Sequence, residues 1–83
     1  RKTRCNQLLD ALQAEKGLVA RGYTFEITDD TDLLIERRGH VCGIWAVSKT
    51  AFAWTDPSYG ESTFRTKDVG EAVAHTIKAL VKR

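Results

Sequence analysis

The side chains best suited to metal chemistry are two thiols and two imidazoles: Cys5, His40, Cys42 and His75. Two cysteines and two histidines match the ligand count of a structural zinc site. Their spacing matches no zinc-binding pattern, however, because the cysteines lie far apart and form no CxxC pair. Cys5 also falls on the apolar side of a predicted helix, whereas His75 falls on the polar side of another. The sequence therefore predicts no metal and no cofactor, and it predicts two unoxidised thiols.

Catalytic groups of other kinds do not form a recognisable constellation. Ser48, Ser58 and Ser62 lie in predicted turns or extended segments without a nearby histidine to serve as a base. Glu26 and Glu36 lie on adjacent predicted strands, but nothing indicates the apolar setting that a catalytic carboxylate pair needs. The chain also lacks a Gly-rich phosphate-binding loop. We therefore expect a protein that is not an enzyme.

The most informative stretch is residues 41–54, which reads as two strands around a two-residue turn at Ser48-Lys49. Side chains alternate across a strand, so this register places Trp45, Phe52 and Trp54 on one face. The opposite face is apolar too, but its side chains are smaller, which favours the close approach of a helix. That small face carries Ile44, Ala46, Ala51 and Ala53.

This register predicts an aromatic sheet face that is left uncovered. Such a face could stack unpaired bases, with the phosphates bound by basic residues at the turns and beyond the sheet: Arg37, Arg38, Lys49, Arg65 and Lys67. The same aromatic face could instead bind a protein, since aromatic residues are enriched at protein interfaces. A one-residue slip of the register would exchange the two faces and make the aromatic residues core.

Two amphipathic helices flank the predicted strands. Residues 1–21 predict a helix with Thr3 as its N-cap and Gly22 as its stop. The second helix begins after Thr66, its predicted N-cap, with Asp68 in the first turn. The core-facing side chains of the first helix are Cys5, Leu8, Leu9, Leu12 and Val19, and those of the second are Val69, Ala72, Val73, Thr76, Ile77, Leu80 and Val81.

The segment between the helices reads as strands joined by short turns. Residues 23–28 and 33–37 are predicted strands, separated by a polar turn at residues 29–32. A two-residue turn at Arg38-Gly39 would pair Ile35 with Cys42. Residues 61–65 are predicted to be extended, with a short edge strand as the alternative. Short connections imply antiparallel pairing, so the predicted fold is two-layer α+β: a four-stranded antiparallel meander with an N-terminal and a C-terminal helix packed on one face.

Length and composition indicate a single small domain without a membrane span. The 83 residues form one predicted domain, 1–83, with 42% apolar residues and a formal net charge of +2. No apolar run approaches the roughly 20 residues of a membrane span, so we expect no membrane partner and a cytoplasmic protein. The order helix, meander, helix is similar to that of double-stranded RNA-binding domains. The chain lacks the Gly- and Lys-rich segment that this family places before its second helix, so the family is not assigned.

Together these features predict a small nucleic-acid-binding module, acting on single strands or duplex through the aromatic face and the basic residues. The alternative is a protein–protein interaction module that docks through the same face. In that case it is a homodimer, or a small accessory or inhibitor protein. Salt-dependent binding to nucleic acid would distinguish the first function from the second.

Overall fold

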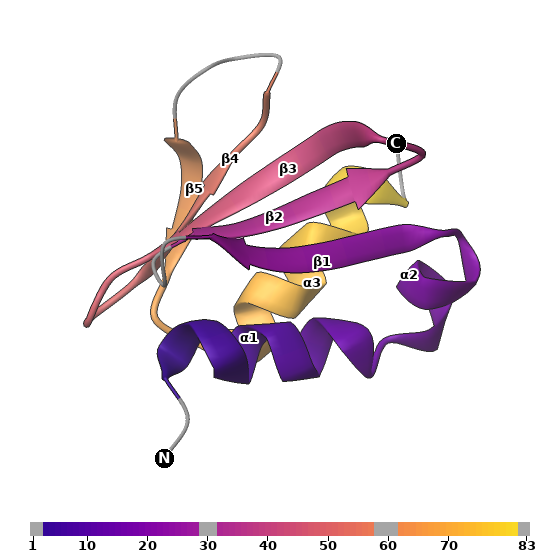
Figure 1. Ribbon diagram of the computed structural model, residues 1–83. Coiled ribbons are helices and arrows are strands. Elements are labelled where there is room, and N and C mark those ends of the chain that lie inside the picture. The colour runs from indigo at the N-terminus through magenta and orange to yellow at the C-terminus, as the bar shows by residue number, and fades with distance from the viewer. Residues whose placement is uncertain (1–2, 29–31, 58–61, 82–83) are drawn as a thin grey trace.

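The computed structural model describes residues 3–28, 32–57 and 62–81 and places five strands between helices (Figure 1). The helices are α1 (Arg4–Gln13), α2 (Lys16–Ala20) and α3 (Val69–Leu80). The strands are β1 (Tyr23–Thr28), β2 (Asp32–Arg37), β3 (His40–Val47), β4 (Phe52–Thr55) and β5 (Ser62–Thr66). They form a single antiparallel sheet in the order β1-β2-β3-β4-β5, which is a meander.

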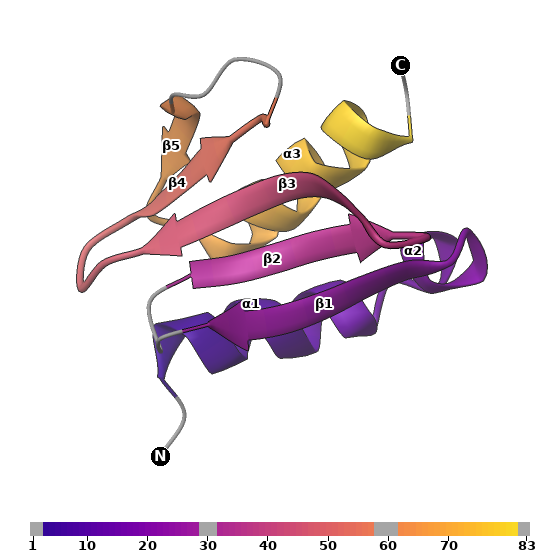
Figure 2. The same cartoon turned by 45° about the horizontal axis from the view of Figure 1, so that its top comes forward.

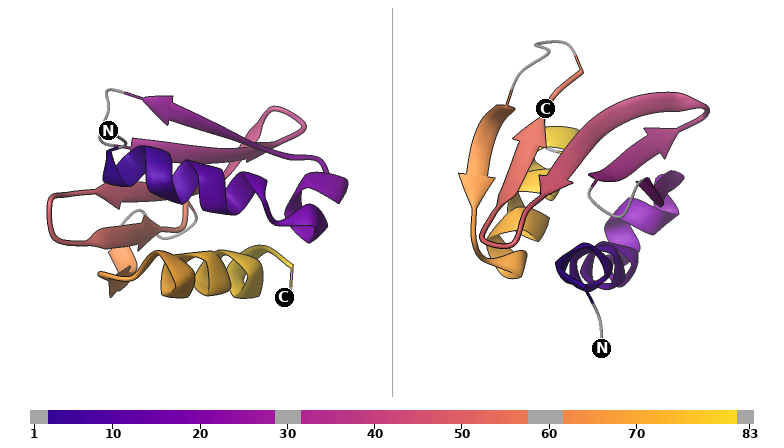
Figure 3. Two further views of the ribbon diagram at one scale, coloured as in Figure 1. Left: turned by 90° about the horizontal axis from the view of Figure 1, so that it is seen from below. Right: turned by 60° about the vertical axis from the view of Figure 1, so that its left-hand side comes forward.

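The predicted α+β class is therefore confirmed, with one strand more than expected. The extra strand is β5, which pairs with β4 at the edge of the sheet. The sequence predicted this segment to be extended and left a short edge strand open as an alternative. Helices α1 and α3 lie on the same side of the sheet, as predicted (Figures 2 and 3). The segment 29–31, which belongs to the predicted polar turn, lies outside the described residues.

The prediction of which sheet face the helices cover is wrong. The helices pack on the aromatic face, where Trp45 and Phe52 are 0% exposed and Trp54 is 1% exposed. These three side chains belong to one core cluster with leucines of α1 and with residues of α3. Among the described residues, no helix covers the predicted small face, so the two faces of β3 and β4 have exchanged roles.

A β-bulge at Cys42 causes this exchange. The turn at Arg38-Gly39 has two residues, as predicted; both residues have positive φ, 55° and 81°, which is the geometry that tight hairpins favour. Beyond the turn, Val41 pairs with Glu36 but Gly43 pairs with Ile35, so Cys42 is an extra residue. One extra residue turns every later side chain of β3 to the other face.

The turn between β3 and β4 also differs from the prediction, with a different consequence. It spans four residues, so Val47 pairs with Phe52 and Trp45 pairs with Trp54. The Ser48 hydroxyl closes it, accepting from the Ala51 N–H at 3.1 Å and donating to the Ala51 carbonyl at 3.2 Å. The four-residue turn shifts the pairing of β4 by two residues relative to the predicted two-residue turn. Side chains alternate with a period of two, so a shift of two leaves each side chain on its predicted face relative to its neighbours. The prediction that the aromatic side chains share one face is therefore kept.

The expected first helix is divided at Ala14 and Glu15, and this division changes which residues are buried. Leu18 on α2 is 1% exposed, whereas Val19, which we expected in the core, is 50% exposed. Thr3 caps α1 as predicted, because its side chain accepts a hydrogen bond from the Asn6 N–H.

The N-cap of α3 is Asp68 and not Thr66. The Asp68 carboxylate accepts from the Glu71 N–H at 2.8 Å. Thr66 contacts both residues of this cap. Its hydroxyl accepts a hydrogen bond from the Asp68 N–H and donates one to the Glu71 carboxylate. The acidic side chain is the better fit at the positive end of the helix dipole.

One hydrogen-bonded chain joins α3 to the middle of the sheet. The Trp45 indole N–H donates to the Thr76 hydroxyl at 2.8 Å, and that hydroxyl donates to the Ala72 carbonyl at 2.8 Å. Trp45 and Thr76 are both 0% exposed. A buried polar group without a partner is costly, so each of these groups depends on the others.

We predict that Thr76→Val lowers the free energy of unfolding by about 1–3 kcal/mol, because it leaves the buried Trp45 N–H without an acceptor. Thr76→Ser keeps the hydroxyl and serves as the matched control, with a smaller loss. Urea denaturation of both variants measures the difference. Equal stability of Thr76→Val and the unchanged protein would mean that this hydrogen bond contributes nothing.

A second prediction concerns Gly43, whose backbone lies under the six-membered ring of Trp54. A Cβ atom at this position would overlap that ring, so the ring must move aside. We expect Gly43→Ala to lower the free energy of unfolding by about 2–3 kcal/mol. The control is Gly17→Ala on α2, where a Cβ meets no atom within 4 Å and the gain is up to about 1 kcal/mol. Denaturation curves that rank the two variants the other way would contradict this packing.

Candidate interaction surface

The surface left uncovered by the helices is the outer side of the sheet, which we call the open face. Its side chains alternate along each strand with those of the core, and none of them is buried. Figure 2 shows the strands of this face in front of α1 and α3. The open face comprises Thr24, Glu26, Thr28, Asp32, Leu34, Glu36, Val41, Ile44, Ala46, Ala53, Thr55 and Arg65.

The centre of the open face is apolar. Leu34 and Ile44 are paired across β2 and β3, and both are half-buried. Ala46 and Ala53 are paired in the next row across β3 and β4. This strip is bordered by carboxylates on the β1 and β2 side and by a guanidinium on the β5 side: Glu26, Asp32, Glu36 and Arg65.

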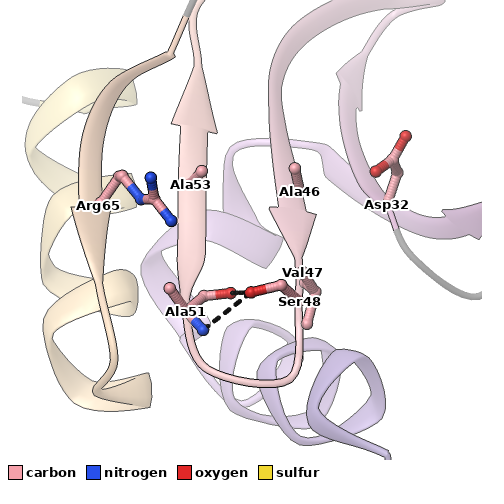
Figure 4. A pocket seen from close by; sticks show the side chains of 7 residues that line it. All are labelled: Asp32, Ala46, Val47, Ser48, Ala51, Ala53 and Arg65. Carbon is pink, nitrogen blue, oxygen red and sulfur yellow. Dashed lines mark hydrogen bonds between the residues drawn. The ribbon is translucent and has the colours of Figure 1, made fainter.

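A shallow hollow of about 340 Å³ lies at one end of the open face, next to the turn between β3 and β4 (Figure 4). Ala46 and Ala53 form its floor, and Asp32 and Arg65 lie on opposite sides of it. The small floor residues create the hollow, because a methyl group is all that rises from the sheet between the two longer charged side chains.

The three aromatic residues predicted to form a binding surface lie in the core instead. Trp45 contacts Trp54 edge to face with ring centroids 5.2 Å apart, and it contacts Phe52 at 6.4 Å. Edge-to-face pairs of this kind stabilise a core. The prediction that Trp45, Phe52 and Trp54 form an exposed aromatic face is therefore wrong, and the reason is the bulge at Cys42.

The basic residues predicted to bind phosphates do not form one cluster. Arg37 and Arg38 lie at the turn before β3, and the Arg37 guanidinium lies 5.3 Å from the centre of the Tyr23 ring. Lys49 lies in the turn after β3, at the other end of that strand. The remaining two side chains are exposed near β5, with Arg65 on the strand and Lys67 directly after it. A role in binding stays a prediction for each of them.

His75 also differs from its prediction, which placed it on the polar side of its helix. Its ring stacks on Phe64 with centroids 4.0 Å apart and planes 3° apart, and its edge contacts Trp54. Its Nε2 atom is buried without a hydrogen-bond partner among the described residues. Burial, and then the nearby Lys78 ammonium, lower the pKa of His75 below its ordinary value of 6.5.

A signal for this burial was present in the helix pattern. His75 follows the buried Ala72 by three residues and precedes the buried Thr76, so it borders the core stripe of α3. The hollow beside it measures about 390 Å³ and lies between β5 and α3. Because the imidazole is stacked and its charged form is disfavoured, we assign it a packing role.

Metal and membrane sites receive no support from the described residues. In residues 3–28, 32–57 and 62–81, no three His, Cys, Asp or Glu side chains come together in a group that could hold a metal ion. Within the same ranges, no helix has the length and apolar character needed to cross a bilayer.

We predict that acidification destabilises the protein through His75. The pKa of His75 is lowered in the folded state, so the unfolded chain takes up the proton first. Stability is then fully present above pH 6.5 and falls as the pH drops through that value. Denaturation between about pH 7.5 and about pH 5.5 measures this slope, which His75→Gln should reduce. His40→Gln, at an exposed position, is the control. Identical slopes in both variants would assign the effect to other groups.

Comparison of the chain with protein-family models, with curated proteins and with solved structures found no match.

Proposed function

We propose that this protein is a non-enzymatic protein-interaction module and that the open face is its docking surface. The observation that carries the proposal is the pair Leu34 and Ile44, which lies in the middle of a sheet face that no helix covers. The adjoining pair Ala46 and Ala53 extends this apolar strip. An apolar centre with a charged border is the composition of many protein interfaces.

The open face suits a protein better than a nucleic acid. The residues that would stack bases are buried, with Trp45 0% exposed and Trp54 1% exposed. Carboxylates outnumber cations on the open face, so the field there repels phosphate. The cations elsewhere are divided between the two ends of β3. These features favour the protein-interaction alternative over the nucleic-acid module that the sequence predicted.

The chemistry of the described residues supports a non-enzymatic module. His75 is stacked against Phe64 and its Nε2 atom is buried, a setting that supports a packing role. Neither Cys5 nor Cys42 forms a disulfide, and Cys5 is buried. Thiols in this state are typical of reducing compartments, so we propose that the module acts in the cytoplasm.

The proposal predicts that Ile44→Lys abolishes partner binding while the fold is retained. A lysine at this position places an ammonium in the apolar strip, which a docked partner would have to bury. The unchanged protein and the variant are each immobilised, and the proteins that each retains from extracts of the source cells are compared. Each protein retained only by the unchanged chain is then identified, purified and titrated. Binding at least about tenfold weaker to Ile44→Lys supports the proposal.

The matched control is Val19→Lys, which changes another exposed apolar side chain, on α2 and away from the open face. It should bind like the unchanged protein. A partner that both variants bind equally would overturn the open face as the docking surface. A parallel titration with single-stranded and duplex oligonucleotides tests the nucleic-acid-binding alternative. Salt-dependent binding there would reinstate the nucleic-acid module.

A further inference from the structure

Two of the four charges of the open face, Asp32 and Arg65, lie in one row that crosses four strands. Asp32 pairs with Ala46, Ala46 pairs with Ala53, and Ala53 pairs with Arg65. Paired residues point to the same side of a sheet, so these four side chains stand in line on the open face. Figure 4 shows Asp32 and Arg65 at the two ends of the row, with the two alanines between them. The row therefore reads acid, small, small, base.

The two charges of this row do not neutralise each other within one chain. Three strand spacings separate β2 from β5, so the backbones of the two residues lie roughly 14 Å apart. Among residues 3–28, 32–57 and 62–81, the side chains of Asp32 and Arg65 have no hydrogen-bonded or ion-paired partner. As far as the described residues go, both charged groups are therefore open to a partner that lies across the open face.

From this row we infer that the partner of the open face is a second copy of the same chain; the inference rests on the proposed function. A two-fold axis parallel to the strands, placed between β3 and β4, turns one open face onto the other. It brings Arg65 of each copy opposite Asp32 of the other and places Ala46 opposite Ala53. The row is thus complementary to itself under this rotation.

The charges also exclude the other symmetric arrangement. An axis lying in the interface but perpendicular to the strands would place β5 on β5 and β2 on β2. Arg65 would then face Arg65, and Asp32 would face Asp32. Like charges placed opposite each other across an interface lower its affinity. The axis parallel to the strands avoids these contacts and is therefore the favoured arrangement.

The neighbouring row of β3 and β4 is compatible with the selected arrangement. Two sheets packed face to face lie about 10 Å apart with nearly aligned strands, and the alanines of the row permit this approach. In the next row Ile44 pairs with Thr55 within one chain, so the rotation places Ile44 opposite Thr55 of the second copy. Glu26 on β1 stays outside the overlap, because no strand lies beyond β5 to face it.

Sedimentation velocity tests this inference, because it measures the mass of the intact protein in solution. The protein concentration is varied from about 10 µM to about 500 µM, which is suited to a weak interface. The unchanged chain should become dimeric as the concentration rises. Arg65→Glu and Asp32→Lys should each remain monomeric, with a dissociation constant at least about tenfold higher. The double variant, which exchanges the two charges, should recover the dimer. Circular dichroism melting checks that each variant is folded.

The control for net charge is Lys78→Glu, which makes the same charge change on α3, away from the open face. It should dimerise like the unchanged chain. An unchanged chain that stays monomeric throughout would overturn the second copy as the partner. A double variant that fails to recover the dimer, or an Arg65→Glu variant as dimeric as Lys78→Glu, would overturn it as well. In either case a purified partner lost by Ile44→Lys would still support the open face as a docking surface.

Discussion

The buried contact between Trp45 and Thr76 is the interaction on which the rest of the structure depends. It fixes α3 to the central strand at 2.8 Å, and it satisfies the one polar atom of a large side chain that is otherwise surrounded by apolar groups. The same hydroxyl donates to the Ala72 carbonyl, so the helix supplies both partners. Because Trp45 is fully buried, its neighbours must pack to its shape, and Gly43 leaves the space that the Trp54 ring occupies.

The bulge at Cys42 determines that Trp45 points toward the helices at all. Without the extra residue, the two-residue turn at Arg38-Gly39 would place Ile44 on the core side and Trp45 on the outer side. The large side chains fill the space between the sheet and two helices, whereas the alanines of the other face leave little to bury. Burying the greater apolar area is the more stable arrangement, and this explains why the register with the bulge is adopted.

The same choice of faces accounts for the character of the outer surface. With the aromatic residues inside, the open face retains small and branched apolar residues in its centre and charges at its border. A surface of this kind suits another sheet or a protein segment, and it offers no ring on which a base could stack. The order of charges along the row from Asp32 to Arg65 then limits how a partner can lie. The proposed function and the proposed dimer both follow from which face the bulge turns outward.

The sequence by itself determined the α+β class, the meander, the cap at Thr3, the turn at Arg38-Gly39 and the grouping of Trp45 with Phe52 and Trp54. These features depend on local chemistry: periodicity, side-chain capping and the φ angles that glycine allows. Tertiary structure alone decided which face is core and where β3 bulges. When both faces of a strand are apolar, the sequence pattern is the same with and without a bulge. Only the packing of the helices then selects which of the two faces becomes core.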